Sequence, residues 1–153
     1  MKLTSSAFTD GGTIPTQYTC DGANLSPPLH WANTPPATRA FALICHDPDA
    51  TGGDWVHWVI YGIPAHATGL PENMAANDTL ADGSIQGVNG NARIGYGGPC
   101  PPPGRPHRYV FTLYALDSDP ALGPGLAKPD LQRAIHGRIL AEAQLIGLYQ
   151  RRP

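Results

Sequence analysis

Five side chains able to bind ions or move protons occur at the ends of three apolar segments of this sequence. They are Asp47, Asp49, His57, His107 and Tyr109. Histidines titrate near neutral pH and donate hydrogen bonds to phosphate oxygens, and a tyrosine hydroxyl adds another donor. The aspartates would hold a histidine in one tautomer or bind an amine. The combination predicts that these side chains meet in one polar pocket.

Strand geometry indicates which of these side chains can meet. Side chains two residues apart point to the same face of a strand, which places Tyr109 beside His107 and Val59 beside His57. Arg108 points away from His107, and we expect it to bond loop carbonyls or an aspartate. The two aspartates flank a proline in a turn at the rim of the sheet, where binding sites collect. Which aspartate faces the pocket stays open.

The same residues could serve other chemistry. In an enzyme, Asp47, His57 and His107 would supply general acid and base to a small molecule. A metal centre of two histidines and one carboxylate is disfavoured, because His46 and Asp47 are consecutive on a strand and face opposite ways, and neither HxH nor HExxH occurs. The GxSxG, P-loop and GxGxxG motifs are also missing from the sequence. We therefore expect neither a metal nor another cofactor.

The elements that position these side chains follow from the apolar pattern. Short apolar runs separated by glycine and proline are typical of an all-β sandwich or barrel. The runs 40–46, 55–63 and 107–116 are dense in apolar, aromatic and β-branched residues, and we expect them to be neighbours in a central sheet. The predicted fold class is therefore mostly β.

A long ordered loop region is predicted between the second and third of these runs. Residues 65–106 are rich in Asn, Asp, Gly and Pro, and loops of this length in a compact domain are usually functional. We expect this region to form a wall of the site, with Pro101 helping to make it rigid. Backbone N–H groups after Gly97 and Gly98 are expected to form an anion nest.

The C-terminal segment has a different pattern. From Pro129 onward, apolar residues follow an i, i+4, i+8 course, which predicts one amphipathic helix that reaches Tyr149. Proline in the first turn and Asp130 beside it suit the start of a helix, and Arg151 and Arg152 suit the negative end of its dipole. The apolar positions are Leu131, Ile135, Ile139, Ala143, Ile146 and Tyr149.

The length and net charge of the chain indicate how many domains it has and exclude some classes of partner. The chain of 153 residues fits one domain, 1–153, and its ten basic and twelve acidic residues give a net charge of -2. No broad positive field would therefore attract nucleic acid or anionic lipid. The N-terminus lacks the apolar stretch of a signal peptide, and no run approaches the about 20 apolar residues of a membrane span. We expect a cytoplasmic protein that neither spans a membrane nor binds nucleic acid.

The three cysteines are too few and too scattered for a disulfide framework. Cys45 ends an apolar run, so we expect it to be a small buried residue. Cys20 and Cys100 both lie among turn residues. A single bridge between these two stays open if the site is exposed to oxidant.

Five sequence blocks, in this order along nearly the whole chain, resemble the phosphatidylethanolamine-binding protein family and its bacterial Raf-kinase-inhibitor-like branch. Each block is weak alone, and the five together are a strong signature. They are Tyr18–Gly22 followed by Ser26–Trp31, then Asp47–Ala50, Trp55–Trp58, Gly95–Pro102 and His107–Tyr109.

The resemblance implies a β-sandwich-like fold with a large central sheet and a pocket that takes small anions and the phosphate of lipid head groups. We therefore expect a phospho-ligand-binding protein. An inhibitor of a kinase or peptidase, acting through the rim loops, is an alternative, and a protein partner or a homodimer stays open. By position, the residues that match the family pocket are Asp47, Asp49, His57, Pro101, His107 and Tyr109.

Overall fold

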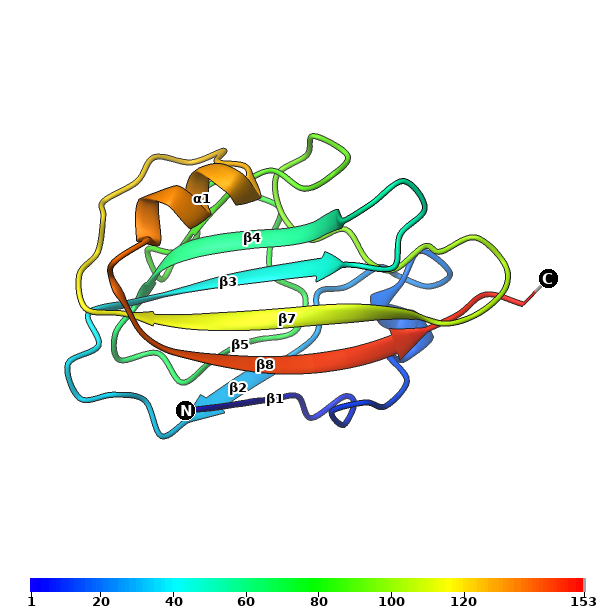
Figure 1. The fold of residues 1–153 in the computed structure, drawn as a ribbon, viewed down its shortest axis with the longest axis horizontal. Coiled ribbons are helices and arrows are strands. Elements are labelled where there is room, and N and C mark those ends of the chain that lie inside the picture. Colours follow the sequence, from blue (N-terminus) through cyan, green and yellow to red (C-terminus); the bar gives the residue numbers. More distant parts are fainter. Residues whose placement is uncertain (153) are drawn as a thin grey trace.

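A five-stranded antiparallel sheet dominates the computed structural model, which describes residues 1–152 (Figure 1). In sheet order, its strands are β6 (Ile85–Gln86), β4 (Trp55–Pro64), β3 (Ala40–Asp47), β7 (His107–Leu116) and β8 (Ile139–Tyr149). The three predicted runs lie side by side within it, which confirms that prediction. They are apolar along most of their length because packed layers cover both faces of the sheet.

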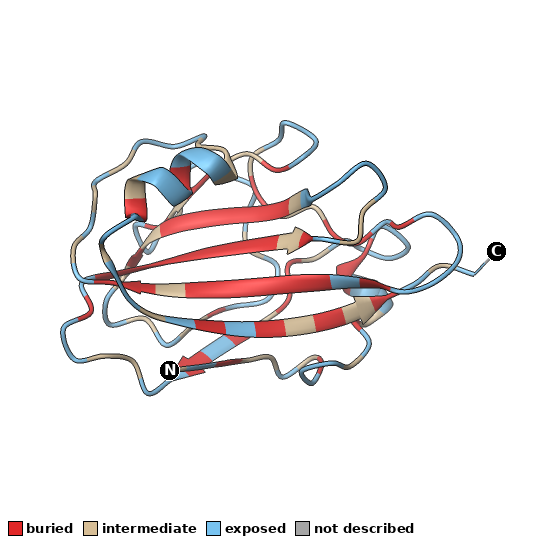
Figure 2. Cartoon of the chain, viewed as in Figure 1, coloured by how far each residue is buried: buried red, intermediate tan, exposed pale blue. Residues whose placement is uncertain are grey.

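A second, smaller sheet covers one face of the large sheet. It consists of β1 (Lys2–Thr4), β2 (Leu29–Ala32) and β5 (Gly69–Leu70), in the order β1-β2-β5. The core between the sheets is rich in aromatic rings, and those of Trp31 and Phe41 pack with centroids 5.3 Å apart. Cys45, free and buried as predicted, lies in the same core. Most residues of the central strands are buried (Figure 2), and the predicted mostly β sandwich is confirmed.

The other face of the large sheet is covered by α1 (Lys128–Ile135) and the loop before it. Leu131 and Ile135 are the buried residues of α1, and they share an apolar cluster with Val59 and Tyr61 of β4. A proline in the first turn and Asp130 mark the helix start, as predicted. Among the helices of residues 1–152, none is long and apolar enough to cross a membrane.

The predicted C-terminal helix is wrong beyond Ile135. The helix ends there, Gly137 adopts a left-handed φ of 82°, and Ile139–Tyr149 form the strand β8. A spacing of four residues is also a multiple of the two-residue period of a strand, so Ile135, Ile139 and Ala143 fit both patterns. A glycine just past the last helical turn is the usual signal of a helix end. The two C-terminal arginines therefore follow a strand and face no helix dipole.

Candidate functional site

A cavity of about 570 Å³ opens where β3, β4 and β7 meet the loops that contain residues 89–91 and 97–102. Two walls enclose it. The strand wall consists of Asp47, His57, His107 and Tyr109, and the loop wall consists of residues 97–102. Of the eight predicted ligand residues, the seven that line the cavity are Asp47, His57, Gly97, Gly98, Pro101, His107 and Tyr109.

His57 reaches the cavity because β4 is bulged at this position. The pairing of β3 with β4 shifts register between Cys45 and His46, which leaves His57 as the extra residue. An extra residue in a bulge changes the side-chain alternation. Val59 accordingly lies in the apolar cluster under α1, whereas His57 faces Tyr109 on the cavity side. The prediction that His57 and Val59 share one face is wrong for this reason.

The ring of His57 is held from two sides. Its Nδ1 donates a hydrogen bond to the Gly97 carbonyl 2.6 Å away, and its ring meets Tyr109 edge-on with centroids 5.1 Å apart. A carbonyl only accepts, so the proton lies on Nδ1 and the neutral ring keeps its lone pair on Nε2. Burial lowers the pKa of His57 below its ordinary value. The resting form at neutral pH is therefore an uncharged ring whose Nε2 accepts.

Asp47 orients the second histidine. Its Oδ2 accepts a hydrogen bond from His107 Nδ1 at 2.7 Å, and its Oδ1 accepts the backbone N–H of Asp49, also at 2.7 Å. Both partners are buried, with 3% of Asp47 and 6% of His107 exposed. A carboxylate bonded to Nδ1 fixes the tautomer and the orientation of the ring. Asp47 is thus the aspartate that faces the pocket, and protein donors already bond both of its oxygens.

Asp49 lies outside the cavity and belongs to an ion pair at its rim. Arg108 donates from Nε to Asp49 Oδ2 and from Nη2 to Oδ1, each at 2.9 Å. Its backbone N–H also donates to Oδ2 at 2.9 Å. These hydrogen bonds hold the pKa of Asp49 well below its usual range. The predicted structural role of Arg108 matches this pairing, and Asp49 joins β3 to β7 instead of lining the pocket.

Both histidines present Nε2 to the cavity. Neither Nε2 has a hydrogen-bond partner within residues 1–152, and in that range no fully buried side-chain nitrogen or oxygen lacks one. The two Nε2 atoms must therefore open into the space that their residues line. Burial, with Asp47 nearby, raises the pKa of Tyr109, so its hydroxyl keeps its proton and can donate.

The loop wall supplies shape and acceptors in place of the predicted anion nest. The N–H of Gly97 donates to the His57 carbonyl at 2.9 Å, and the N–H of Gly98 donates to Asn24 Oδ1 at 2.9 Å. Positions 99, 101 and 102 are prolines and have no N–H to offer. The nest prediction is wrong because tertiary partners already use both glycine donors.

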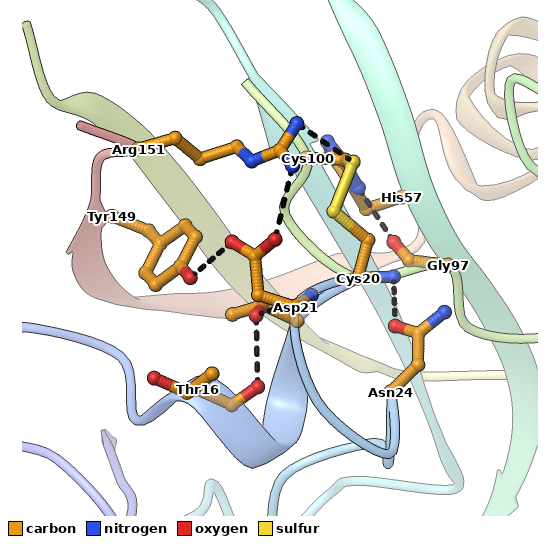
Figure 3. Close-up of a disulfide and its surroundings, with 11 residues drawn as sticks. Thr16, Cys20, Asp21, Asn24, His57, Gly97, Cys100, Tyr149 and Arg151 are labelled. Atoms are coloured by element: carbon orange, nitrogen blue, oxygen red, sulfur yellow. Dashed lines mark hydrogen bonds and ion pairs between the residues drawn. A yellow bond between two sulfur atoms is a disulfide. The ribbon is translucent and has the colours of Figure 1, made fainter. Parts of the chain in front are cut away.

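A disulfide ties the loop wall to the N-terminal part of the chain. The bridge that the sequence left open is formed between Cys20 and Cys100, whose Cα atoms are 5.4 Å apart and which lie 80 residues apart in sequence (Figure 3). Beside it, Asp21 accepts a hydrogen bond from the Tyr149 hydroxyl at 2.5 Å and pairs with Arg151 at 3.1 Å. These contacts join the loop wall, the segment around Cys20 and the end of β8.

Two further side chains that line the cavity, Trp55 and Asn89, were missed as ligand candidates. Trp55 is 41% exposed, and its ring lies so close to Gly90 that a Cβ there would come within 2.5 Å of it. Asn89 accepts the N–H of Asn91 at 2.9 Å and donates to the Gly95 carbonyl at 3.1 Å. The sequence held a signal for each. Trp55 is an aromatic residue two positions before the strand histidine His57, and Asn89 begins an Asn-Gly turn.

The chemistry of the site is hydrogen bonding and proton binding. It offers two ring nitrogens, one phenol and one buried carboxylate. Nowhere in residues 1–152 do three His, Cys, Asp or Glu side chains gather closely enough to hold a metal ion. His46 faces away from the cavity and pairs through Nδ1 with Asp54 at 2.5 Å.

Comparison with known proteins places this fold and site in a family. The sequence model described as phosphatidylethanolamine-binding protein matches residues 4–150. The chain belongs to this family. A UPF0098 protein of Methanothermobacter thermautotrophicus is 53% identical to this family member over 151 residues, which cover 99% of each chain.

Two solved structures of phosphatidylethanolamine-binding protein homologues share the fold. CT736 from Chlamydia trachomatis has a TM-score of 0.90 and 37% identity, covering 98% of this chain and 97% of its own. YbcL from E. coli has a TM-score of 0.89 and 31% identity, covering 99% of this chain and 98% of its own. The relatives include archaeal as well as bacterial proteins, so the likeness extends beyond the bacterial branch that the sequence resembles.

Proposed function

We propose that this member of the phosphatidylethanolamine-binding protein family binds small anions and holds a phosphate group, free or on a phosphorylethanolamine-like head group, between His57 and His107. One observation carries the proposal: both Nε2 atoms face one cavity while protein acceptors hold both Nδ1 atoms. A ring held through Nδ1 points Nε2 at the ligand, where it accepts a P–OH group or, when protonated, donates a strong charge-assisted hydrogen bond to a phosphate oxygen.

The rest of the cavity suits a small organic group attached to the anion. Its volume of about 570 Å³ lies in the range of small-molecule sites, which are mostly apolar with a few placed polar groups. Trp55, Pro101 and Pro102 supply apolar surface beside the histidines. The anion would therefore lie at the strand wall, with the remainder of the ligand along these three side chains.

Catalysis in the same pocket is a second candidate, and the Asp47–His107 pair favours it. A buried carboxylate that orients a histidine is the arrangement found in general acid–base catalysis. An enzyme would release inorganic phosphate or another product from a bound phosphomonoester, and His107→Asn would abolish that turnover. A binding protein would return the ligand unchanged, which phosphorus NMR of the incubated mixture measures.

The cellular location is likewise a proposal. We expect the cytoplasm from the sequence, whereas disulfides are typical of oxidising compartments. Alkylation of free thiols at cell lysis tests the expectation. Three reactive thiols in denatured chains indicate a reducing compartment, since the sequence has three cysteines. Labelling of Cys45 alone would contradict the cytoplasmic proposal, because the bridge then exists in the cell.

Titration calorimetry with inorganic phosphate tests the binding proposal. We expect weak binding by the wild type and about tenfold to hundredfold weaker binding by His57→Ala and His107→Ala, since a charge-assisted hydrogen bond contributes about 1.5–3 kcal/mol. His66→Ala, at an exposed loop position, is the matched control and should bind like the wild type. Thermal melts establish that each variant folds. Failure of the wild type to bind, or unchanged affinity in both site variants, would overturn the proposal.

A further inference from the structure

Resting on the function proposed above, we infer that the cavity takes its phosphate group as a monoanion with one P–OH proton, which is donated to Nε2 of His57. Phosphomonoesters and inorganic phosphate can carry such a proton. Phosphodiesters, which include intact phospholipid head groups, cannot. The site therefore prefers a phosphomonoester to a diester.

Charge around the cavity favours a monoanion. Asp47 is the one carboxylate in the wall, and none of the lining residues within the described chain is a lysine or arginine. Arg108 is held at the rim by Asp49. With His107 protonated, the Asp47–His107 pair is neutral overall, so a bound dianion would bring two uncompensated charges and a monoanion only one. Removing uncompensated charge from water is costly, and the monoanion costs less.

Hydrogen bonding sets His57 as an acceptor. Its Nδ1 donates to the Gly97 carbonyl, and the Gly97 N–H donates back to the His57 carbonyl, so two bonds join these residues. Turning the ring over would break the first of them. The lone pair of the neutral ring therefore stays on the cavity side, where an unprotonated phosphate oxygen would meet a second acceptor. A P–OH group supplies the donor that this position lacks.

His107 has the complementary role. Its Nδ1 is fixed by Asp47, so an Nε2–H on the same ring would point into the cavity and donate to an unprotonated phosphate oxygen. One wall position then accepts and the other donates. A phosphomonoester monoanion carries both matching groups, whereas sulfate and a diester carry only acceptors at neutral pH.

The groups around His57 leave its ring neutral. Burial is the largest influence and lowers its pKa, while the backbone of Gly97 and Gly98 and the charges of Asp47 and Asp54 act in the opposite direction. From β7, His107 lines the same cavity and Tyr109 packs against the ring with its hydroxyl protonated. The net effect is a lowered pKa of His57, which agrees with a neutral ring whose Nε2 accepts a hydrogen bond.

Calorimetry with three small anions tests the inference. Methyl phosphate is the monoester, dimethyl phosphate is its diester match, and sulfate is a dianion throughout. At about pH 6.5 we expect methyl phosphate to bind at least about tenfold more tightly than either control anion. Its affinity should fall about tenfold or more by about pH 8, because the second ionisation of a phosphomonoester near pH ~6 removes the P–OH proton.

A variant and an NMR measurement locate the proton. His57→Gln places an amide in the wall that can donate as well as accept, so the preference for methyl over dimethyl phosphate should shrink to about threefold or less. His66→Gln, at an exposed position, should keep the full preference. In the complex of the wild type with methyl phosphate, the nitrogen-15 shift of His57 Nε2 should be that of an unprotonated, hydrogen-bonded nitrogen.

The possible results separate this inference from the proposed function. Preference for methyl phosphate with an unprotonated His57 Nε2 supports the inference. Equal binding of methyl and dimethyl phosphate, affinity that rises toward pH 8, or a protonated His57 Nε2 in the complex would overturn it while anion binding at the cavity still stands. Binding of none of the three anions would overturn the proposed function together with the inference.

Discussion

The two walls of the cavity are built by different means. In the strand wall, the pairing of β7 with β3 and β8 positions His107 and Tyr109. Many ladder hydrogen bonds together fix the place of β7. The loop wall has almost no ladder pairing. It is held by single cross-links, which include the disulfide, the Gly98 bond to Asn24 and the two hydrogen bonds between Gly97 and His57. Just before it, the Tyr96 hydroxyl donates to the Tyr18 carbonyl at 2.7 Å.

Because the two walls are built differently, they have different functional roles. The strand wall holds the groups that bind protons and anions, because a register shared by three strands fixes side chains firmly. The loop wall contributes apolar shape and the Gly97 carbonyl that sets the tautomer of His57. Loosening the loop should therefore weaken anion binding while the Asp47–His107 pair stays intact.

The largest effect is expected from removing the disulfide. Cys20→Ser with Cys100→Ser should lower the free energy of unfolding by about 2–5 kcal/mol, because the bridge closes a long loop in the unfolded chain. Urea unfolding measures the loss, and phosphate affinity should fall as well. Reductant should lower the stability of the wild type to the same level and leave the double variant unchanged. If reductant left the unfolding free energy of the wild type unchanged, the stabilising role of the disulfide would be refuted.

Gly98→Ala tests the close packing of the loop wall. A Cβ at this position would lie 2.3 Å from Asn24 Oδ1 and 2.4 Å from the Tyr18 carbonyl oxygen, so the loop must shift. We expect a loss of about 1–3 kcal/mol of unfolding free energy, as for other overpacked sites. Gly123→Ala is the control, since nothing lies within 4 Å of its Cβ position. Equal stability of the two variants in urea unfolding would contradict the packing described.

Stiffness of the loop wall is tested by replacing Pro101 and Pro102 with glycine. The double variant should lose about 1–2 kcal/mol of unfolding free energy, from ~0.4–1 kcal/mol per site of restored chain freedom. It should also bind phosphate more weakly, because a mobile wall must be ordered on binding. Pro35→Gly with Pro36→Gly, in a turn away from the cavity, should lose similar stability and bind normally. The same phosphate affinity in both double variants would argue against a preorganised wall.

The smallest effect is expected in the pH dependence of stability. The folded pKa of His57 is lowered by burial, so the unfolded chain binds a proton that the folded chain resists. Stability of the wild type should therefore fall, relative to His57→Gln, as pH drops below about 6.5, with a slope no steeper than about 1.4 kcal/mol per pH unit. Urea midpoints between pH 5 and 8 measure it. A relative gain in wild-type stability toward low pH would contradict a buried neutral ring.

Much of the strand wall could be predicted from the sequence. The central strands are long apolar runs, and strict alternation along β7 put His107 and Tyr109 on one face. Alternation failed for His57 because a bulge depends on how β4 pairs with β3, and one strand's sequence does not contain that information. Asp47 and Asp49 could not be told apart for a similar reason. Their partners, His107 and Arg108, are neighbours in sequence that point to opposite sides.

The loop wall was less predictable. Its prolines indicated stiffness, but the donors of Gly97 and Gly98 are taken by His57 and Asn24, which are distant in sequence. Composition alone could not pair Cys20 with Cys100 either, because the bridge depends on two loops meeting. Strand pairing produces an alternation of buried and exposed residues that can be seen in the sequence. A single cross-link between two loops produces no repeating pattern in the sequence.

A crystal of the protein soaked in phosphate tests the central claim most directly. We predict electron density for one anion in the cavity, with oxygens at hydrogen-bond distance, about 2.7–2.9 Å, from Nε2 of both His57 and His107. The Nδ1 bonds of both rings to Gly97 and Asp47 should be unchanged. An empty cavity at saturating phosphate, or an anion bound to the loop wall away from both histidines, would contradict the claim.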